Sequence, residues 1–121
     1  MNHKLKIRSK KYLAAARGQS CTRCGVNDGT VVAAHYTGFR SHQFGKGTGT
    51  KVHDLLVADL CMECHAFFDN PDLGLRHNTE HNRMWKKLEM SEEFMFCVAM
   101  TQIRRCEQGI LYTDDIKLGD G

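Results

Sequence analysis

Two pairs of cysteines constrain the fold of this chain more than any other feature of its sequence. Cys21 and Cys24 form one C-x-x-C pair, and Cys61 and Cys64 form a second pair after 36 intervening residues. Two residues between thiols allow both sulfur atoms to lie about 2.3 Å from one metal ion, and two such pairs complete a closed tetrahedral site. The sequence therefore predicts a structural Zn²⁺ ion bound by all four cysteines.

Other uses of the cysteines fit the sequence less well. The chain has six cysteines and no apolar leader near its start, so we do not expect a disulfide framework. One C-x-x-C pair alone could be a redox or metal-sensing site, but a second pair at this separation favours structural zinc. The remaining Cys97 and Cys106 lie nine residues apart in an expected helix, and we interpret them as buried structural thiols.

Length and composition fit one small domain. The chain has 121 residues, of which 41% are hydrophobic and 26% are charged, as is ordinary for globular proteins. We interpret 1–121 as one domain with a basic arm and helix over 1–18, a zinc-binding core over 19–70, and C-terminal helices with an acidic tail over 71–121. No apolar run approaches the roughly 20 residues that cross a bilayer, so we expect a cytoplasmic protein without a membrane partner.

The pattern of the first half of the chain predicts helices and strands together, which is an α+β fold. A short basic helix is expected between the N-cap Ser9 and Gly18. Apolar and β-branched residues predict strands within 30–36 and 52–61. A helix is expected to begin near Cys64.

Two helices are expected in the C-terminal part. The first covers about residues 79–90, and its Met84, Trp85 and Leu88 are expected to face the core. The second begins at the N-cap candidate Ser91, which two acidic residues follow.

His65 and Asp69 remain once the four cysteines are assigned to zinc. Four residues apart at the start of a helix, they lie on one helix face and can chelate a second ion. An imidazole and a carboxylate suit Mg²⁺, Mn²⁺ or Zn²⁺ with positions open for water and substrate. The alternative is a spare donor beside zinc and a charge on the helix surface.

Positive charge is uneven along the chain, although the net charge is only +3. Residues 1–17 contain six lysines and arginines and no acidic residue, and the glycine-rich segment 37–51 contains three more basic residues. This distribution is typical of proteins that bind a polyanion such as nucleic acid, although a solvated surface can have the same composition. The candidate phosphate-binding residues are Lys10, Lys11, Arg40, Lys46 and Lys51.

The order of these motifs resembles the zinc-stapled form of the HNH, or ββα-metal, endonucleases. The resemblance rests on the first C-x-x-C, a strand ending in His35, a loop with a polar residue, and C-x-x-C-H on a helix. A closer likeness is to the YbcO-like family of phage and prophage proteins assigned as nucleases, through "AARG", "AAHY", "GTGTK", "DLL" and "CMECHAFFD" within residues 12–112. A more distant likeness is to the phage RecA-dependent nuclease Ref.

The resemblance implies a treble-clef, or ββα-metal, core with flanking helices and a metal-dependent DNA endonuclease. It implies that His35 is the general base, that Asp54 orients this base, and that His65 is catalytic. His65 and Asp69 are then the ligands of a catalytic Mg²⁺ or Mn²⁺ ion. DNA is the implied partner, together with a recombination protein, in the cytoplasm of a bacterial host cell. The oligomeric state is left open.

Two positions leave alternatives open within this resemblance. Many HNH enzymes place a metal ligand directly before the first histidine, where this chain has Ala34. The alternative function is therefore a zinc-stapled nucleic-acid-binding module without catalysis. His53 is the runner-up for the position assigned to Asp54, and the role of His77 is left open.

Overall fold

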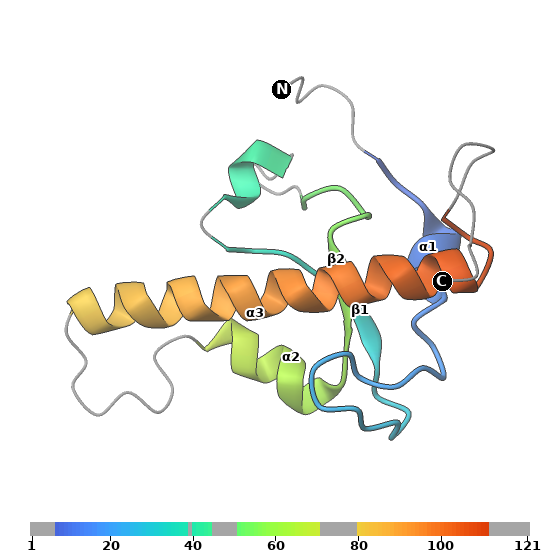
Figure 1. Ribbon diagram of the computed structural model, residues 1–121, viewed down its shortest axis with the longest axis horizontal. Coiled ribbons are helices and arrows are strands. Elements are labelled where there is room, and N and C mark those ends of the chain that lie inside the picture. The colour runs from blue at the N-terminus through green and yellow to red at the C-terminus, as the bar shows by residue number, and fades with distance from the viewer. Residues whose placement is uncertain (1–6, 39, 45–50, 71–79, 112–121) are drawn as a thin grey trace, which may run out of the picture.

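The computed structural model describes residues 7–38, 40–44, 51–70 and 80–111, except for the side chains of residues 81 and 82. These residues form a small α+β structure with three α-helices and a two-stranded sheet (Figure 1). In chain order the elements are α1 (Lys10–Ala14), β1 (Val32–His35), the 3₁₀ helix η1 (Ser41–Phe44), β2 (Val57–Leu60), α2 (Met62–Asp69) and α3 (Glu80–Glu107).

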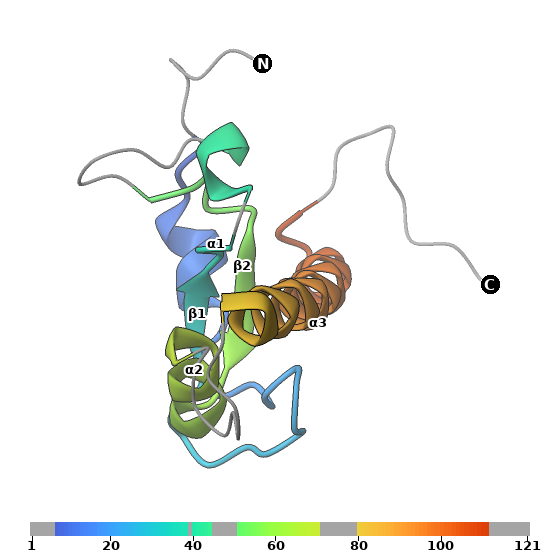
Figure 2. The ribbon, with the colours of Figure 1, turned by 90° about the vertical axis from the view of Figure 1, so that its left-hand side faces the viewer.

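The two strands form an antiparallel hairpin at the centre of the structure. Val32 pairs with Leu60 at one end of the hairpin, and His35 pairs with Val57 at the other end. All four residues of β2 are buried, because α3 packs against this strand. Figure 2 shows α3 on one side of the hairpin and α2 at the end where β2 leads into it. The hairpin therefore holds the start of α2 at a fixed position.

The two short helices begin at residues that cap them. The Ser9 side chain accepts a hydrogen bond from the Tyr12 amide at the start of α1, as expected, although α1 ends at Ala14 rather than near Gly18. Helix α2 begins at Met62, two residues before the expected start, because the Cys61 sulfur accepts a hydrogen bond from the Cys64 amide.

Helix α3 is one continuous helix of 28 residues, so the expectation of two helices was wrong. Ser91 lies inside the helix because no glycine or proline interrupts it. Met84, Trp85 and Leu88 are 52%, 55% and 45% exposed, so the expectation that they face the core was also wrong. The buried face instead consists of Met90, Phe94, Cys97, Val98, Thr101 and Arg105.

A buried ionic cluster joins β2, α3 and α1. The fully buried Asp59 accepts hydrogen bonds from Arg104 at 2.9 Å and from the fully buried Arg105 at 2.6 Å. The Asp59 amide donates to the Thr101 hydroxyl, and Arg105 Nε donates to the Tyr12 carbonyl at 2.8 Å. Each charged group in the core is therefore paired and hydrogen-bonded, as burial of ions requires.

Candidate functional site

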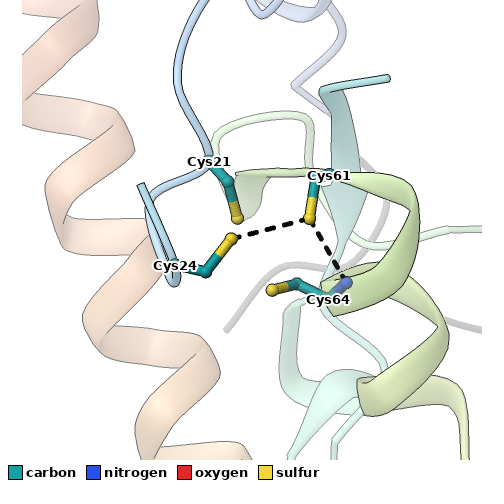
Figure 3. Close-up of side chains that lie close together, drawn as sticks. All are labelled: Cys21, Cys24, Cys61 and Cys64. Atoms are coloured by element: carbon teal, nitrogen blue, oxygen red, sulfur yellow. Dashed lines mark hydrogen bonds between the residues drawn. The ribbon is translucent and has the colours of Figure 1, made fainter. Parts of the chain in front are cut away.

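The four predicted zinc ligands meet in one cluster, which confirms that they can hold a metal ion such as zinc. All four sulfur atoms lie within 4.8 Å of one another and point toward a common centre (Figure 3). Four sulfur atoms about 2.3 Å from one tetrahedral ion stand about 3.8 Å apart. The Cys24 and Cys61 sulfur atoms are 3.8 Å apart, so the geometry fits zinc.

The first pair of cysteines lies in a tight turn that is attached to β2. The Cys21 amide donates to the Val26 carbonyl at 2.7 Å, and the Gly25 amide donates to the Cys21 carbonyl at 2.9 Å. Gly25 has a φ of +83°, a conformation that residues with a Cβ rarely adopt. The Thr22 amide donates to the Asp59 carbonyl at 2.8 Å, which places this turn beside the start of α2.

The thiols of the cluster differ in acidity. Burial raises the pKa of Cys64 to about 12, although a hydrogen bond from Arg23 opposes this effect. Burial also raises the pKa of Cys21, but hydrogen bonds from backbone amides lower it overall to about 6. Four sulfur atoms this close cannot all ionise without a cation between them, so a divalent metal would displace the remaining protons.

Arg23 lies between the first two cysteines and contacts three parts of the structure. Its Nη1 atom donates to the Cys64 sulfur at 3.4 Å, and its Nε atom donates to Glu93 of α3 at 2.8 Å. Its guanidinium carbon lies 3.9 Å from the centre of the Phe67 ring of α2. A zinc ion bound by four thiolates would carry two net negative charges, which this guanidinium would partly neutralise. Nothing in the local sequence indicates this role of Arg23, because its contacts come from residues 41 or more positions away.

Arg23→Met is expected to weaken zinc binding about tenfold, the lower range for residues that hydrogen-bond to metal ligands. Methionine preserves the apolar contact with Phe67 but removes the charge and the hydrogen bond to the Cys64 sulfur. The measurement is the rate of zinc transfer to a chromogenic chelator. Glu93→Gln is the matched control, because it weakens only the ion pair of Arg23 with α3. Equal rates for Arg23→Met and wild type would show that Arg23 does not stabilise the metal.

His35 and Asp54 are in direct contact at the opposite end of the hairpin. His35 Nε2 lies 2.8 Å from Asp54 Oδ1, and the Asp54 carboxylate also accepts from the Ser9 amide at 2.7 Å and from Arg8 Nη1 at 3.3 Å. Burial raises the pKa of Asp54, but the hydrogen bonds from His35 and Ser9 and the nearby positive charge lower it overall below its ordinary value. Because an ionised carboxylate only accepts, His35 Nε2 carries the proton and Nδ1 can accept another.

The chain before α1 runs beside this pair. The Ile7 amide donates to His53 Nδ1 at 2.9 Å, and the Asp54 amide donates to the Ile7 carbonyl at 2.8 Å. The structure thus places Asp54 against His35 and engages His53 with the N-terminal segment. The catalytic roles of His35 and Asp54 remain predictions.

His65 and Asp69 lie together on α2. His65 Nε2 is 3.7 Å from Asp69 Oδ2, and both side chains are accessible to solvent. Within the described residues neither belongs to a cluster of three or more close metal-binding side chains, and neither does His35. His35 pairs with Val57, whereas α2 follows Leu60, about 10 Å further along the strand. The candidate catalytic residues thus form two pairs, His35 with Asp54 and His65 with Asp69.

Ala34 faces the core. It is buried in the cluster that also contains Val31, Leu60 and Val98. An acidic residue or a histidine at this position would be buried among apolar side chains rather than exposed to a metal ion.

A cavity of about 460 Å³ lies between the chain that follows β1, the end of α2 and the first half of α3. Its wall includes Tyr36, the residue after His35, and Asp69 of α2. Aromatic rings meet there, because the Phe94 ring lies 5.9 Å from that of Tyr36 and 5.1 Å from that of Phe68. The cavity thus reaches from Tyr36, which follows the candidate base His35, to the candidate metal ligand Asp69.

The candidate phosphate-binding residues lie on the surface where the structure describes them. Lys10 and Lys11 are exposed on α1, and Arg40 and Lys51 are exposed beside η1 and β2. Lys46 and His77 lie outside the described residues. Cys97 is buried, as expected, while Cys106 is partly exposed and its sulfur donates to the Leu111 carbonyl.

Comparison with protein-family models, curated proteins and solved structures finds no match to this chain. None of the helices in its described residues is long and apolar enough to cross a membrane. Its function is therefore inferred from the geometry of the cysteine cluster and of the histidine sites.

Proposed function

We propose that this chain is a metal-dependent DNA endonuclease of the HNH type, with a treble-clef or ββα-metal core. The contact between His35 and Asp54 is the observation that supports this proposal most. A histidine at the end of a strand is held by a buried, ionised carboxylate, and its second ring nitrogen can accept a proton. This arrangement suits a general base that acts near neutral pH.

The chemistry of phosphodiester hydrolysis assigns a role to each candidate residue. His35 accepts a proton from the attacking water through Nδ1, and Asp54 stabilises the imidazolium that results. His65 and Asp69 would hold Mg²⁺ or Mn²⁺, which supplies positive charge to the transition state and the leaving oxygen. The zinc cluster has a structural role, because four thiolates leave no position open for substrate.

Exposed positive charge supports nucleic acid as the substrate. Lys10, Lys11, Arg40 and Lys51 are all exposed, and such side chains bind phosphates and position the duplex. A phage or prophage origin, a role in DNA recombination with a protein partner, and a cytoplasmic location belong to the same proposal.

The second candidate function is a nucleic-acid-binding module without catalysis. Two observations favour it: Ala34 faces the core, and His65 and Asp69 have no close third ligand among the described residues. In that case the hydrogen bonds that Asp54 accepts from His35, Arg8 and Ser9 would serve only to attach the N-terminal segment.

A cleavage assay separates the two candidates. The purified protein is incubated with supercoiled and linear DNA in Mg²⁺ or Mn²⁺, beside His35→Ala and the control His53→Ala. Removal of a general base lowers a rate by about 10² to 10⁴-fold, so we expect His35→Ala to lose cleavage and His53→Ala to retain it. Melting temperatures measured in parallel separate a catalytic loss from a structural one.

Two results would contradict the assignment. Cleavage by His35→Ala at the wild-type rate would exclude His35 as the base. DNA binding without cleavage in any divalent ion would favour the binding module.

A further inference from the structure

The side of α3 opposite its buried face carries an apolar stripe. Nine residues correspond to about two and a half helical turns, so Trp85 and Ile103 both lie on the side opposite to buried Phe94. Phe96 and Ile103 are 58% and 55% exposed, comparable to Trp85. We call this surface the outer stripe, and it consists of Trp85, Leu88, Phe96, Met100 and Ile103.

No labelled element covers the outer stripe in the described part of the chain. Figure 2 shows α3 seen along its axis, with the hairpin, α1 and α2 all on one side of it. Helices on protein surfaces normally direct one apolar face to the core and a polar face to water. An apolar face on each side of α3 therefore indicates a second packing partner.

We propose that the outer stripe is the interface of a homodimer in which two copies of α3 pack antiparallel. Half-exposed large side chains contribute roughly 100 Å² each, so the stripe offers roughly 500 Å² per copy. Two copies would bury about 1,000 Å², which is about the minimum expected of a specific interface. This interface does not depend on the proposed nuclease activity, because it uses no residue of the cysteine or histidine sites.

The placement of the stripe favours a second copy as its occupant. Trp85 and Ile103 lie nine residues before and after Phe94, which is close to the middle of the helix. A two-fold axis near Phe94 would therefore place Trp85 of each copy against Ile103 of the other, with the whole stripe covered. An unrelated partner would not require this symmetry.

Charge on the same face favours antiparallel over parallel pairing. Glu92 is exposed between Leu88 and Phe96 along the stripe. Parallel helices would place Glu92 directly against its equivalent in the second copy, and like charges in contact are destabilising. In the antiparallel arrangement Glu92 lies against Phe96, and the two Glu92 residues are offset from each other by about 6 Å along the helix axis.

Sedimentation and fluorescence test for the dimer. Because buried area alone does not set affinity, association is measured by analytical ultracentrifugation from about 1 to 100 µM, the range of weak specific dimers. Trp85 is the only tryptophan of the chain, and its emission should shift to shorter wavelength as the dimer forms. Phe96→Glu should raise the dissociation constant at least about tenfold, with an unchanged circular dichroism spectrum.

Met62→Glu is the matched control, because Met62 is 70% exposed on α2, outside the outer stripe. This variant should associate like wild type. A protein that stays monomeric throughout the concentration range would overturn the proposal. So would a dimer that Phe96→Glu does not weaken.

A pair of charge substitutions tests the antiparallel arrangement. Trp85→Glu and Ile103→Lys should each weaken association, and the double variant should associate more tightly than either single variant. In an antiparallel dimer the new glutamate faces the new lysine at both ends of the interface. In a parallel dimer each would face its own equivalent, so a double variant weaker than both single variants would contradict the arrangement.

Discussion

Cys61→Ser is expected to lose the zinc ion and to leave the chain unfolded. The Cys61 sulfur is buried, lies 3.8 Å from the Cys24 sulfur, and accepts the hydrogen bond that begins α2. Structural zinc contributes about 10 to 16 kcal/mol in small zinc-binding domains, whereas a domain of this size has a total stability of about 5 to 15 kcal/mol. Loss of one ligand therefore removes a free energy comparable to the whole stability of the fold.

Metal content by mass spectrometry and helix content by circular dichroism measure both effects. Cys106→Ser is the matched control, because the same chemical change is made outside the cluster at a partly exposed position. A serine hydroxyl can also donate to the Leu111 carbonyl in place of the thiol. We expect this control to retain one zinc ion per chain and to fold.

A strong chelator should produce the same result with wild-type protein, and added zinc should restore helix content. The interpretation of the cluster as the structural metal site would fail if Cys61→Ser bound one equivalent of zinc and folded normally.

Elements set by local sequence were predictable, because their determinants lie close together along the chain. The C-x-x-C spacing indicated the cysteine cluster, and Ser9 indicated the start of α1. Helix α3 was harder, because apolar residues lie on two of its faces. Sequence periodicity identifies both Phe94 and Trp85 as members of apolar stripes, but it does not indicate which stripe packs against β2. The choice depends on tertiary packing.

The other features of the structure could not be predicted from local sequence, because they depend on contacts between residues that are far apart along the chain. The resemblance to HNH endonucleases drew attention to His35 and Asp54, which the structure brings into contact across 19 residues. Asp59 interrupts an apolar strand, and nothing near it in the sequence identifies Arg105 as its partner 46 residues later. Such a pair becomes visible only when the register of β2 against α3 is known.

The buried pair of Asp59 and Arg105 leads to the second large effect. Asp59→Ala is expected to lower the free energy of unfolding by about 3 to 5 kcal/mol, because it leaves a buried guanidinium without its anion. Arg105 is fully buried, and two of its nitrogen atoms donate to the carboxylate. Its bond to the Tyr12 carbonyl would remain but cannot neutralise the charge.

Urea unfolding of the zinc-saturated protein measures this loss. Arg104→Met is the matched control, because Arg104 also donates to Asp59 but is partly exposed and its loss leaves the carboxylate paired with Arg105. Arg104→Met also removes the hydrogen bonds to the Ser20 carbonyl and hydroxyl, so it should cost about 1 to 2 kcal/mol.

The double variant Asp59→Leu with Arg105→Met distinguishes the cost of an unpaired charge from the value of the pair. Replacing both ions by apolar side chains removes the buried charge altogether, and such replacements are often neutral or stabilising. The double variant should therefore be more stable than Asp59→Ala, although it lacks more hydrogen bonds. If the double variant is instead less stable than Asp59→Ala, the hydrogen bonds of Arg105 to Tyr12 and Gln108 contribute more to stability than the ion pair does. The main role of Arg105 would then be to attach α1 to α3.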